Sequence, residues 1–129
     1  MEERRKQPRK DLMSYSQVFN LDDGKLIGYL GDLGLSGAMV IGDNSMDVNT
    51  QLNVSIQLPE LPRIKETRLI VPVRVAHCHP DLSPAYFNIG LAFDVINDEQ
   101  KAIINAVIEN YEFRRQTPDY SPTSSELEE

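Results

Sequence analysis

The sequence predicts a small all-β fold, an antiparallel barrel or sandwich of six strands followed by one C-terminal helix. Short apolar segments recur along the chain with turn-forming residues between them, and most of them alternate apolar with polar positions. A single segment near the C-terminus has helical periodicity instead. The length of 129 residues suffices for one hydrophobic core and is too short for two, which predicts a single domain.

The first two strands are predicted as a hairpin. Met13–Phe19 is the first arm and Leu26–Leu30 the second. Between them, Asp23 and Gly24 form a favourable turn because glycine tolerates a positive φ. After a loop at 32–37, the apolar segment Ala38–Ile41 is the third strand.

Three further strands follow. Val54–Leu58 alternates apolar and polar residues, and so does Leu69–Val75, which is expected to have an edge or a bulge at Pro72 because proline cannot donate a ladder hydrogen bond. The last strand is Phe87–Phe93.

The helix is predicted to begin after Asn97, with Gln100 three residues on as the partner in a capping box. It carries an apolar face that covers one end of the β-structure. The residues of this face are Ile103, Ile104, Val107, Ile108 and Tyr111. We therefore expect the folded domain at 11–113, followed by a disordered acidic tail at 114–129 that is rich in Thr, Pro, Ser and Glu.

Charge is distributed unevenly. The first ten residues hold five basic and two acidic groups, a net charge of +3, so the overall charge of −7 leaves −10 for the other 119 residues. An acidic body repels polyanions, and the arm at 1–10 contains no aromatic side chain for stacking on bases. We therefore expect no DNA or RNA partner.

The sequence also disfavours a membrane protein, a secreted protein and an enzyme. No apolar run is long enough to span a bilayer, the N-terminus does not look like a signal peptide, and the single cysteine, Cys78, suits a reducing compartment. A cytoplasmic protein without membrane insertion is expected. The sequence contains no spaced nucleophile and base and no phosphate-cradling loop at a helix start, so neither an enzyme nor a resident cofactor is expected.

A metal site is also considered at His77, Cys78 and His79. On a strand, the two histidines share one face while Cys78 points the other way, so the three cannot converge on one ion. The sequence therefore predicts no metal site, and Cys78 is interpreted as a packing residue.

Two segments carry the functional prediction. The basic arm has arginines spaced as Arg-Arg-x-x-x-Arg, at Arg4, Arg5 and Arg9. The loop Asp32-Leu33-Gly34-Leu35-Ser36-Gly37 lies about two dozen residues later. An arginine-rich arm and a small acidic turn together suit a compact anionic ligand that also presents base edges, as a nucleotide does.

These motifs, the β-rich body and the Ile89-Gly90-Leu91-Ala92-Phe93 segment before the helix resemble the PilZ domain family over about residues 3–112. The resemblance implies a six-stranded antiparallel barrel with a C-terminal helix that acts as a bacterial receptor for cyclic di-GMP. The family pairs RxxxR with a downstream Asp/Asn-x-Ser-x-x-Gly. Arg5 and Arg9 match the first motif and Asp32 and Gly37 the second, but Gly34 stands where the family has serine.

By this resemblance, Arg5 and Arg9 bind guanine edges and phosphates, with assistance from Arg4. Asp32 accepts the guanine N1–H and amino donors. Gly37 allows a close approach of backbone or a positive φ.

The replacement of serine by Gly34 removes a hydrogen bond worth ~0.5–1.5 kcal/mol, or ~1.5–3 kcal/mol to a charged partner. If Gly34 has an ordinary φ, serine is expected to restore this bond. If Gly34 has a positive φ, serine is expected to strain the turn.

Two functions therefore stay open. In the first, cyclic di-GMP orders the arm over the barrel, and an effector protein recognises the changed surface. Ten residues without an apolar anchor cannot offset the entropy of ordering by themselves, so the arm is expected to be flexible without ligand. In the alternative, the domain is a PilZ-like module that binds proteins and not the nucleotide.

Overall fold

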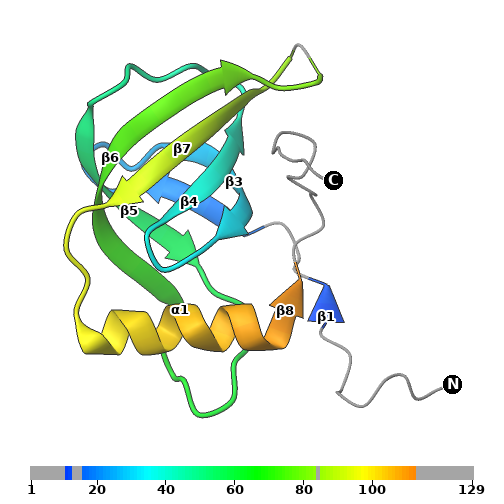
Figure 1. Ribbon diagram of the computed structural model, residues 1–129, viewed down its shortest axis with the longest axis vertical. Coiled ribbons are helices and arrows are strands. Elements are labelled where there is room, and N and C mark those ends of the chain that lie inside the picture. The colour runs from blue at the N-terminus through cyan, green and yellow to red at the C-terminus, as the bar shows by residue number, and fades with distance from the viewer. Residues whose placement is uncertain (1–10, 13–15, 84, 113–129) are drawn as a thin grey trace, which may run out of the picture.

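The protein forms a closed barrel of six antiparallel strands with a helix across one end (Figure 1). The computed structural model describes residues 11–12, 16–83 and 85–112. Around the barrel, the order of strands is β2-β3-β4-β7-β6-β5, and β5 pairs with β2 to close it. The barrel strands are β2 (Gln17–Asn20), β3 (Leu26–Leu33), β4 (Gly37–Gly42), β5 (Gln51–Gln57), β6 (Arg68–Pro80) and β7 (Phe87–Phe93). The predicted all-β barrel is confirmed, and the sandwich alternative is excluded.

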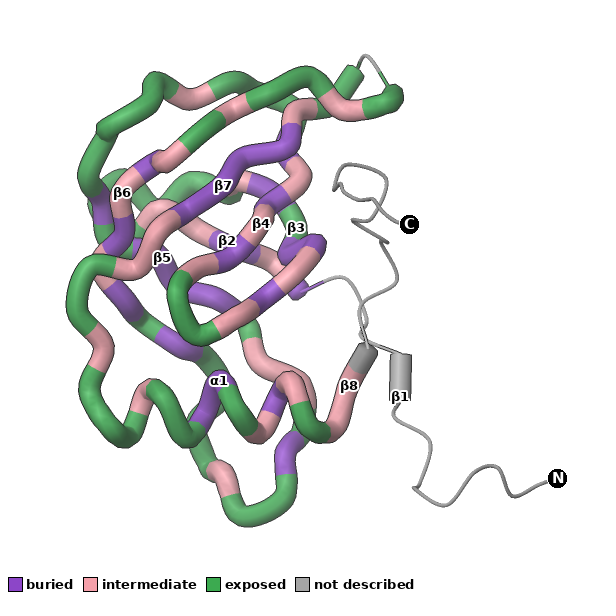
Figure 2. Tube along the Cα trace, viewed as in Figure 1, coloured by how far each residue is buried: buried purple, intermediate pink, exposed green. Residues whose placement is uncertain are grey.

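Alternating side chains of all six strands fill the barrel, and Figure 2 shows the buried positions recurring along the strands while the connecting loops are mostly exposed. Each strand contributes at least one residue that is nearly inaccessible to solvent. Examples in chain order are Val18, Leu30, Val40, Val54, Val71 and Ile89.

The helix α1 (Asp98–Asn110) begins as the sequence predicts. The Asn97 side chain accepts from the Gln100 N–H and the Gln100 side chain accepts from the Asn97 N–H, both at 2.8 Å. Ile103, Ile104 and Val107 join the barrel core, so the expected apolar face does cover the end of the barrel. Gln100 Nε2 also donates to the Ile70 carbonyl at 2.8 Å, which ties the start of the helix to β6.

A two-stranded parallel pair that the sequence did not predict joins the two ends of the domain. β1 (Asp11–Leu12) pairs with β8 (Tyr111–Glu112), directly after α1. The predicted strand Met13–Phe19 is partly wrong, because β2 covers only Gln17–Asn20, and residues 13–15 lie outside the described residues. The predicted arm at 1–10 and tail at 114–129 lie outside them as well.

The prediction of an edge or bulge at Pro72 is confirmed for the edge and wrong for the bulge. The ladder between β6 and β7 begins only at Val73, so Pro72 has a strand partner on the β5 side alone, where it pairs in regular register with Asn53. The Pro72 carbonyl accepts from the N–H of Asp94, the residue after the end of β7, at 3.0 Å. Its missing N–H therefore faces the end of the β6–β7 ladder, where the loss of one bond is tolerated.

Candidate functional site

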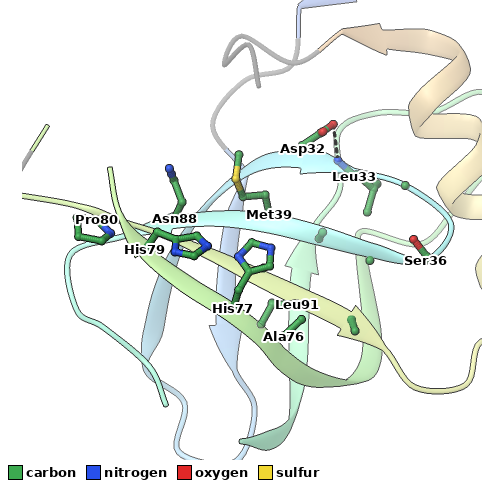
Figure 3. Close-up of a pocket in the computed structure, with 15 residues that line it drawn as sticks. Asp32, Leu33, Ser36, Met39, Ala76, His77, His79, Pro80, Asn88 and Leu91 are labelled. Carbon is green, nitrogen blue, oxygen red and sulfur yellow. Dashed lines mark hydrogen bonds between the residues drawn. The ribbon is translucent and has the colours of Figure 1, made fainter. Parts of the chain in front are cut away.

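A pocket of about 680 Å³ lies against β4, β7 and β6, beside the turn that joins β3 to β4 (Figure 3). This volume is within the range of ~300–1,000 Å³ that is typical of small-molecule sites. Several of the residues that line it are small, including Gly37, Ala76, Gly90 and Ala92. Larger residues line the pocket on two sides, from the β3–β4 turn and from β6.

One wall is the β3–β4 turn, which is shorter than the predicted loop at 32–37. Asp32 is still within β3 and pairs with Met39 of β4, after a register shift that leaves Gly31 as an extra residue. Asp32 Oδ1 accepts from the Leu33 N–H at 2.9 Å, which orients the carboxylate at the edge of the pocket. The Gly34 N–H donates to the Gly37 carbonyl at 2.8 Å and closes the turn.

The two glycines of this turn differ in what their backbones require. Neither has a positive φ, which among the described glycines occurs only at Gly24. A Cβ at Gly34 would have one neighbour, the Gly37 carbonyl oxygen at 3.9 Å, so the position has room for a side chain. A Cβ at Gly37 would overlap the Leu91 carbonyl oxygen of β7. The positive-φ explanation of Gly37 is therefore wrong, and the close approach of β4 to β7 accounts for it.

The other wall comes from β6, where a β-bulge changes which face the side chains occupy. Val75 pairs with Leu91 of β7, but His77 pairs with Gly90, so Ala76 is an extra residue. Val75 is in the core, and strict alternation would also place His77 and His79 there. Because the bulge inserts one residue, both histidines lie on the outer face, where they are exposed.

The two imidazole rings are stacked on each other. Their centroids are 5.0 Å apart and their planes differ by 21°, and Figure 3 shows them beside Met39 and Asn88. Desolvation of the His77 ring lowers its pKa below the ordinary 6.5, and repulsion from His79 lowers it further.

Cys78 points away from this pair, as predicted for neighbouring strand positions. Its Sγ accepts from the Met46 N–H at 3.5 Å, and its side chain is partly buried against the core, which supports its interpretation as a packing residue. Within the described part of the chain, no group of three or more His, Cys, Asp or Glu side chains could hold a metal ion.

The structure brings together three of the six site residues that the sequence predicted, namely Asp32, Gly34 and Gly37. Arg4, Arg5 and Arg9 lie outside the described residues. Sequence reasoning missed the opposite wall, formed by His77 and His79. The sequence does contain an indication of this wall. Counted in steps of two from the buried Val75, the next positions are His77 and His79. Polar rings at positions where the alternation predicts core residues indicate that the alternation is interrupted before them.

Comparison with known proteins agrees with this architecture. The family model described as the PilZ domain matches residues 3–110. No helix among the described residues has the length and apolar character needed to cross a membrane. No curated protein matches the sequence significantly.

Two solved structures are similar in fold. One is the Bacillus subtilis inhibitor of motility MotI/DgrA, with a TM-score of 0.60, 18% identity, and coverage of 80% of this chain and 50% of that chain. The chain thus spans half the length of that relative. The other is the PilZ domain of YcgR from Escherichia coli with c-di-GMP, with a TM-score of 0.57, 11% identity, and coverage of 82% and 89%.

Proposed function

The chain belongs to the PilZ domain family, and from this premise we propose that it is a cytoplasmic bacterial receptor for cyclic di-GMP rather than an enzyme. The observation that carries the proposal is the pocket beside the β3–β4 turn. Asp32, Gly34 and Gly37, which occupy the second family motif, all line it. The similar fold of the YcgR domain, whose structure contains c-di-GMP, supports the same ligand.

In this proposal, the Asp32 carboxylate accepts hydrogen bonds from the edge of a guanine. Asp32 Oδ1 accepts from the Leu33 N–H, and Oδ2 is the acceptor that we assign to the guanine N1–H and amino group. Gly34 and Ser36 lie beside it in the turn and line the same pocket. The backbone here is ordinary, so the missing serine hydroxyl weakens binding without deforming the turn.

The arm supplies the positive charge for the phosphates and the arginine forks for the guanine acceptors. The Ser16 carbonyl accepts from the Leu30 N–H at 2.8 Å, so the chain that follows the arm runs beside β3, two residues before Asp32. The arm joins the described chain at Asp11, which pairs with Tyr111 of β8. Arg9 lies two residues before Asp11, so in this proposal the arm extends from the β1–β8 pair to the ligand, and its ordering by the ligand presents a new surface to an effector protein.

The experiment is a calorimetric titration of cyclic di-GMP into the full chain and into a chain that lacks residues 1–10. Arg5→Ala and Arg9→Ala should each weaken binding by ~1–3 kcal/mol, the cost of a lost bidentate guanine contact, and Arg4→Ala by less. Arg68→Ala is the matched control, because Arg68 is exposed at the start of β6 and does not line the pocket. Equal affinity of the wild type and both arginine variants would refute the proposed role of the arm.

A second candidate function is a protein-interaction module that does not bind the nucleotide. Gly34 favours it, because the chain lacks the hydroxyl that the family motif supplies. The same titration separates the two candidates, since this alternative expects no heat of binding with the full chain. The stoichiometry also reports whether one or two nucleotides bind.

A further inference from the structure

The wall of the pocket opposite Asp32 has a feature that the family motifs do not include. His77 and His79 are the only aromatic rings among the described residues that line the pocket. They come from β6, whereas the second family motif lies on β3 and β4. A purine ligand gains affinity from an aromatic face, and such stacking tolerates any base.

The His77 ring occupies a space that the neighbouring strand leaves open for it. The bulge at Ala76 turns the side chain to the outer face, and Gly90 of β7 lies opposite it in the ladder. A Cβ at Gly90 would lie 2.7 Å from Cδ2 of the ring and closer still to Nε2 and Cε1. Only glycine therefore leaves space for the imidazole to lie across β7.

The register also shows where a base could lie. One face of the His77 ring is covered by His79 at 5.0 Å between centroids, a distance that fits a single stacked pair and leaves no room for a base between the rings. The next row of the sheet in the other direction pairs Ala92 with Gly37 of β4 and with Arg74 of β6. Ala92 and Gly37 are small and both line the pocket, so the side chains of this row leave the pocket open beside His77.

We propose that His77 is a third ligand-binding element of this chain, on which a purine base stacks over Ala92 and Gly37 with its edge toward Asp32. His79 is the positioning residue that holds the His77 ring from behind. This inference rests on the proposed function, because it takes the ligand to be a guanine dinucleotide. It adds a residue, a base position and a dependence on pH to that function.

The dependence on pH follows from the charges around the ring. Among the described residues, the titratable side chains that line the pocket are Asp32, His77 and His79, while the facing residues of β4 and β7, Met39, Asn88 and Gly90, carry no charge. Arg74, the preceding charged residue of β6, donates to Asn49 and does not line the pocket.

Phosphates, the N7 and O6 acceptors and the purine face all interact better with imidazolium than with neutral imidazole. The ligand therefore raises the pKa of His77, and its binding takes up a proton.

The first test is the affinity for cyclic di-GMP, measured by calorimetry at about pH 8, where the imidazole is neutral. His77→Ala should weaken binding about 5- to 150-fold, and His77→Phe should retain most of the affinity because it keeps the ring. Gly90→Ala should weaken binding as well, since its methyl group displaces the His77 ring. Arg68→Ala should bind as the wild type does, and the thermal midpoint of each variant reports that it is folded.

The second test is the same titration between about pH 8 and about pH 5.5. Wild-type affinity should rise as the pH falls, by up to about tenfold for each unit by which the ligand raises the pKa. His77→Phe should lose this dependence while it still binds, an effect that a merely structural role would not produce.

The possible outcomes distinguish the role of His77 from the receptor function. Binding by the wild type with unchanged affinity in His77→Ala would overturn the inference and leave the proposed receptor function standing. A pH dependence that persists in His77→Phe would overturn the assignment of the proton to His77. Absence of binding by the folded wild type would overturn the receptor function, and this inference with it.

Discussion

The two hairpin turns on either side of β3 each contain a glycine, but the backbone requires glycine in only one of them. In the β2–β3 turn, Gly24 has a φ of +75°, and its N–H donates to the Asn20 carbonyl at 2.7 Å. No heavy atom would lie within 4 Å of a Cβ there, so the backbone conformation alone selects glycine. In the β3–β4 turn, Gly34 has an ordinary φ and open space around it.

The difference shows what the departure from the family motif at Gly34 changes. The turn loses the serine hydroxyl, but its backbone conformation does not require glycine. The turn does not need glycine there, so the fold did not exclude the serine. Gly37, three residues later, adds a third case, because its φ is ordinary and its contact with β7 excludes any side chain. The same change from glycine to alanine at these three positions therefore tests three different physical reasons.

The largest effect is expected for Gly37→Ala. The added Cβ overlaps the Leu91 carbonyl oxygen, which is backbone and cannot rotate away, so β4 and β7 must separate locally. Overpacking of this kind costs ~1–3 kcal/mol, and we expect the upper part of this range in the free energy of unfolding measured with urea. Gly34→Ala is the matched control. An unchanged stability of Gly37→Ala would contradict the close-approach explanation.

Gly24→Ala should have an intermediate effect. Alanine in a left-handed conformation costs ~1–2 kcal/mol, and no clash adds to it. Urea denaturation should show a loss of this size, while the affinity for cyclic di-GMP stays unchanged because Gly24 does not line the pocket. Gly24→Asn should recover part of the stability, since asparagine tolerates this conformation. Equal losses in both variants would show that φ is not the cause.

The smallest effect is expected for Gly34→Ser, and it should appear in binding rather than in stability. The restored hydroxyl should tighten the binding of cyclic di-GMP by ~0.5–1.5 kcal/mol. Calorimetry of Gly34→Ser against Gly34→Ala isolates the hydroxyl from the backbone change. Both variants should be as stable as the wild type or slightly more so, because a side chain reduces the entropy of the unfolded chain. Weaker binding together with a lower melting point would mean that the turn does need glycine.

The elements that the sequence predicted well depend on neighbours in the chain. The capping box of Asn97 and Gln100 joins residues three apart, and the Gly24 turn closes between residues four apart. Asp32, Gly34 and Gly37 belong to one six-residue motif, and all three line the pocket. In each case, a short segment contains the donors, the acceptors and the conformational preference that decide its structure.

The elements that the sequence predicted poorly depend on strands that meet only in the closed barrel. The location of the break in β6 is the main example, because Pro72 was the visible irregularity while the bulge lies at Ala76. Proline lacks one donor, but the end of β7 makes that loss harmless. Conversely, alanine by itself does not indicate a bulge, and the register of β6 with β7 decides that the extra residue is Ala76.

The sequence by itself therefore determined the alternation of the strands, the hairpin turns, the helix and the acidic turn of the site. Only the tertiary structure decided that His77 and His79 lie in the pocket. A period of two is a local property, but the phase of that period changes when one extra residue is inserted, and the register with β7 determines where this happens. Gly90 illustrates the same dependence, since it is an unremarkable strand glycine until the His77 ring of the neighbouring strand occupies the space of its missing side chain.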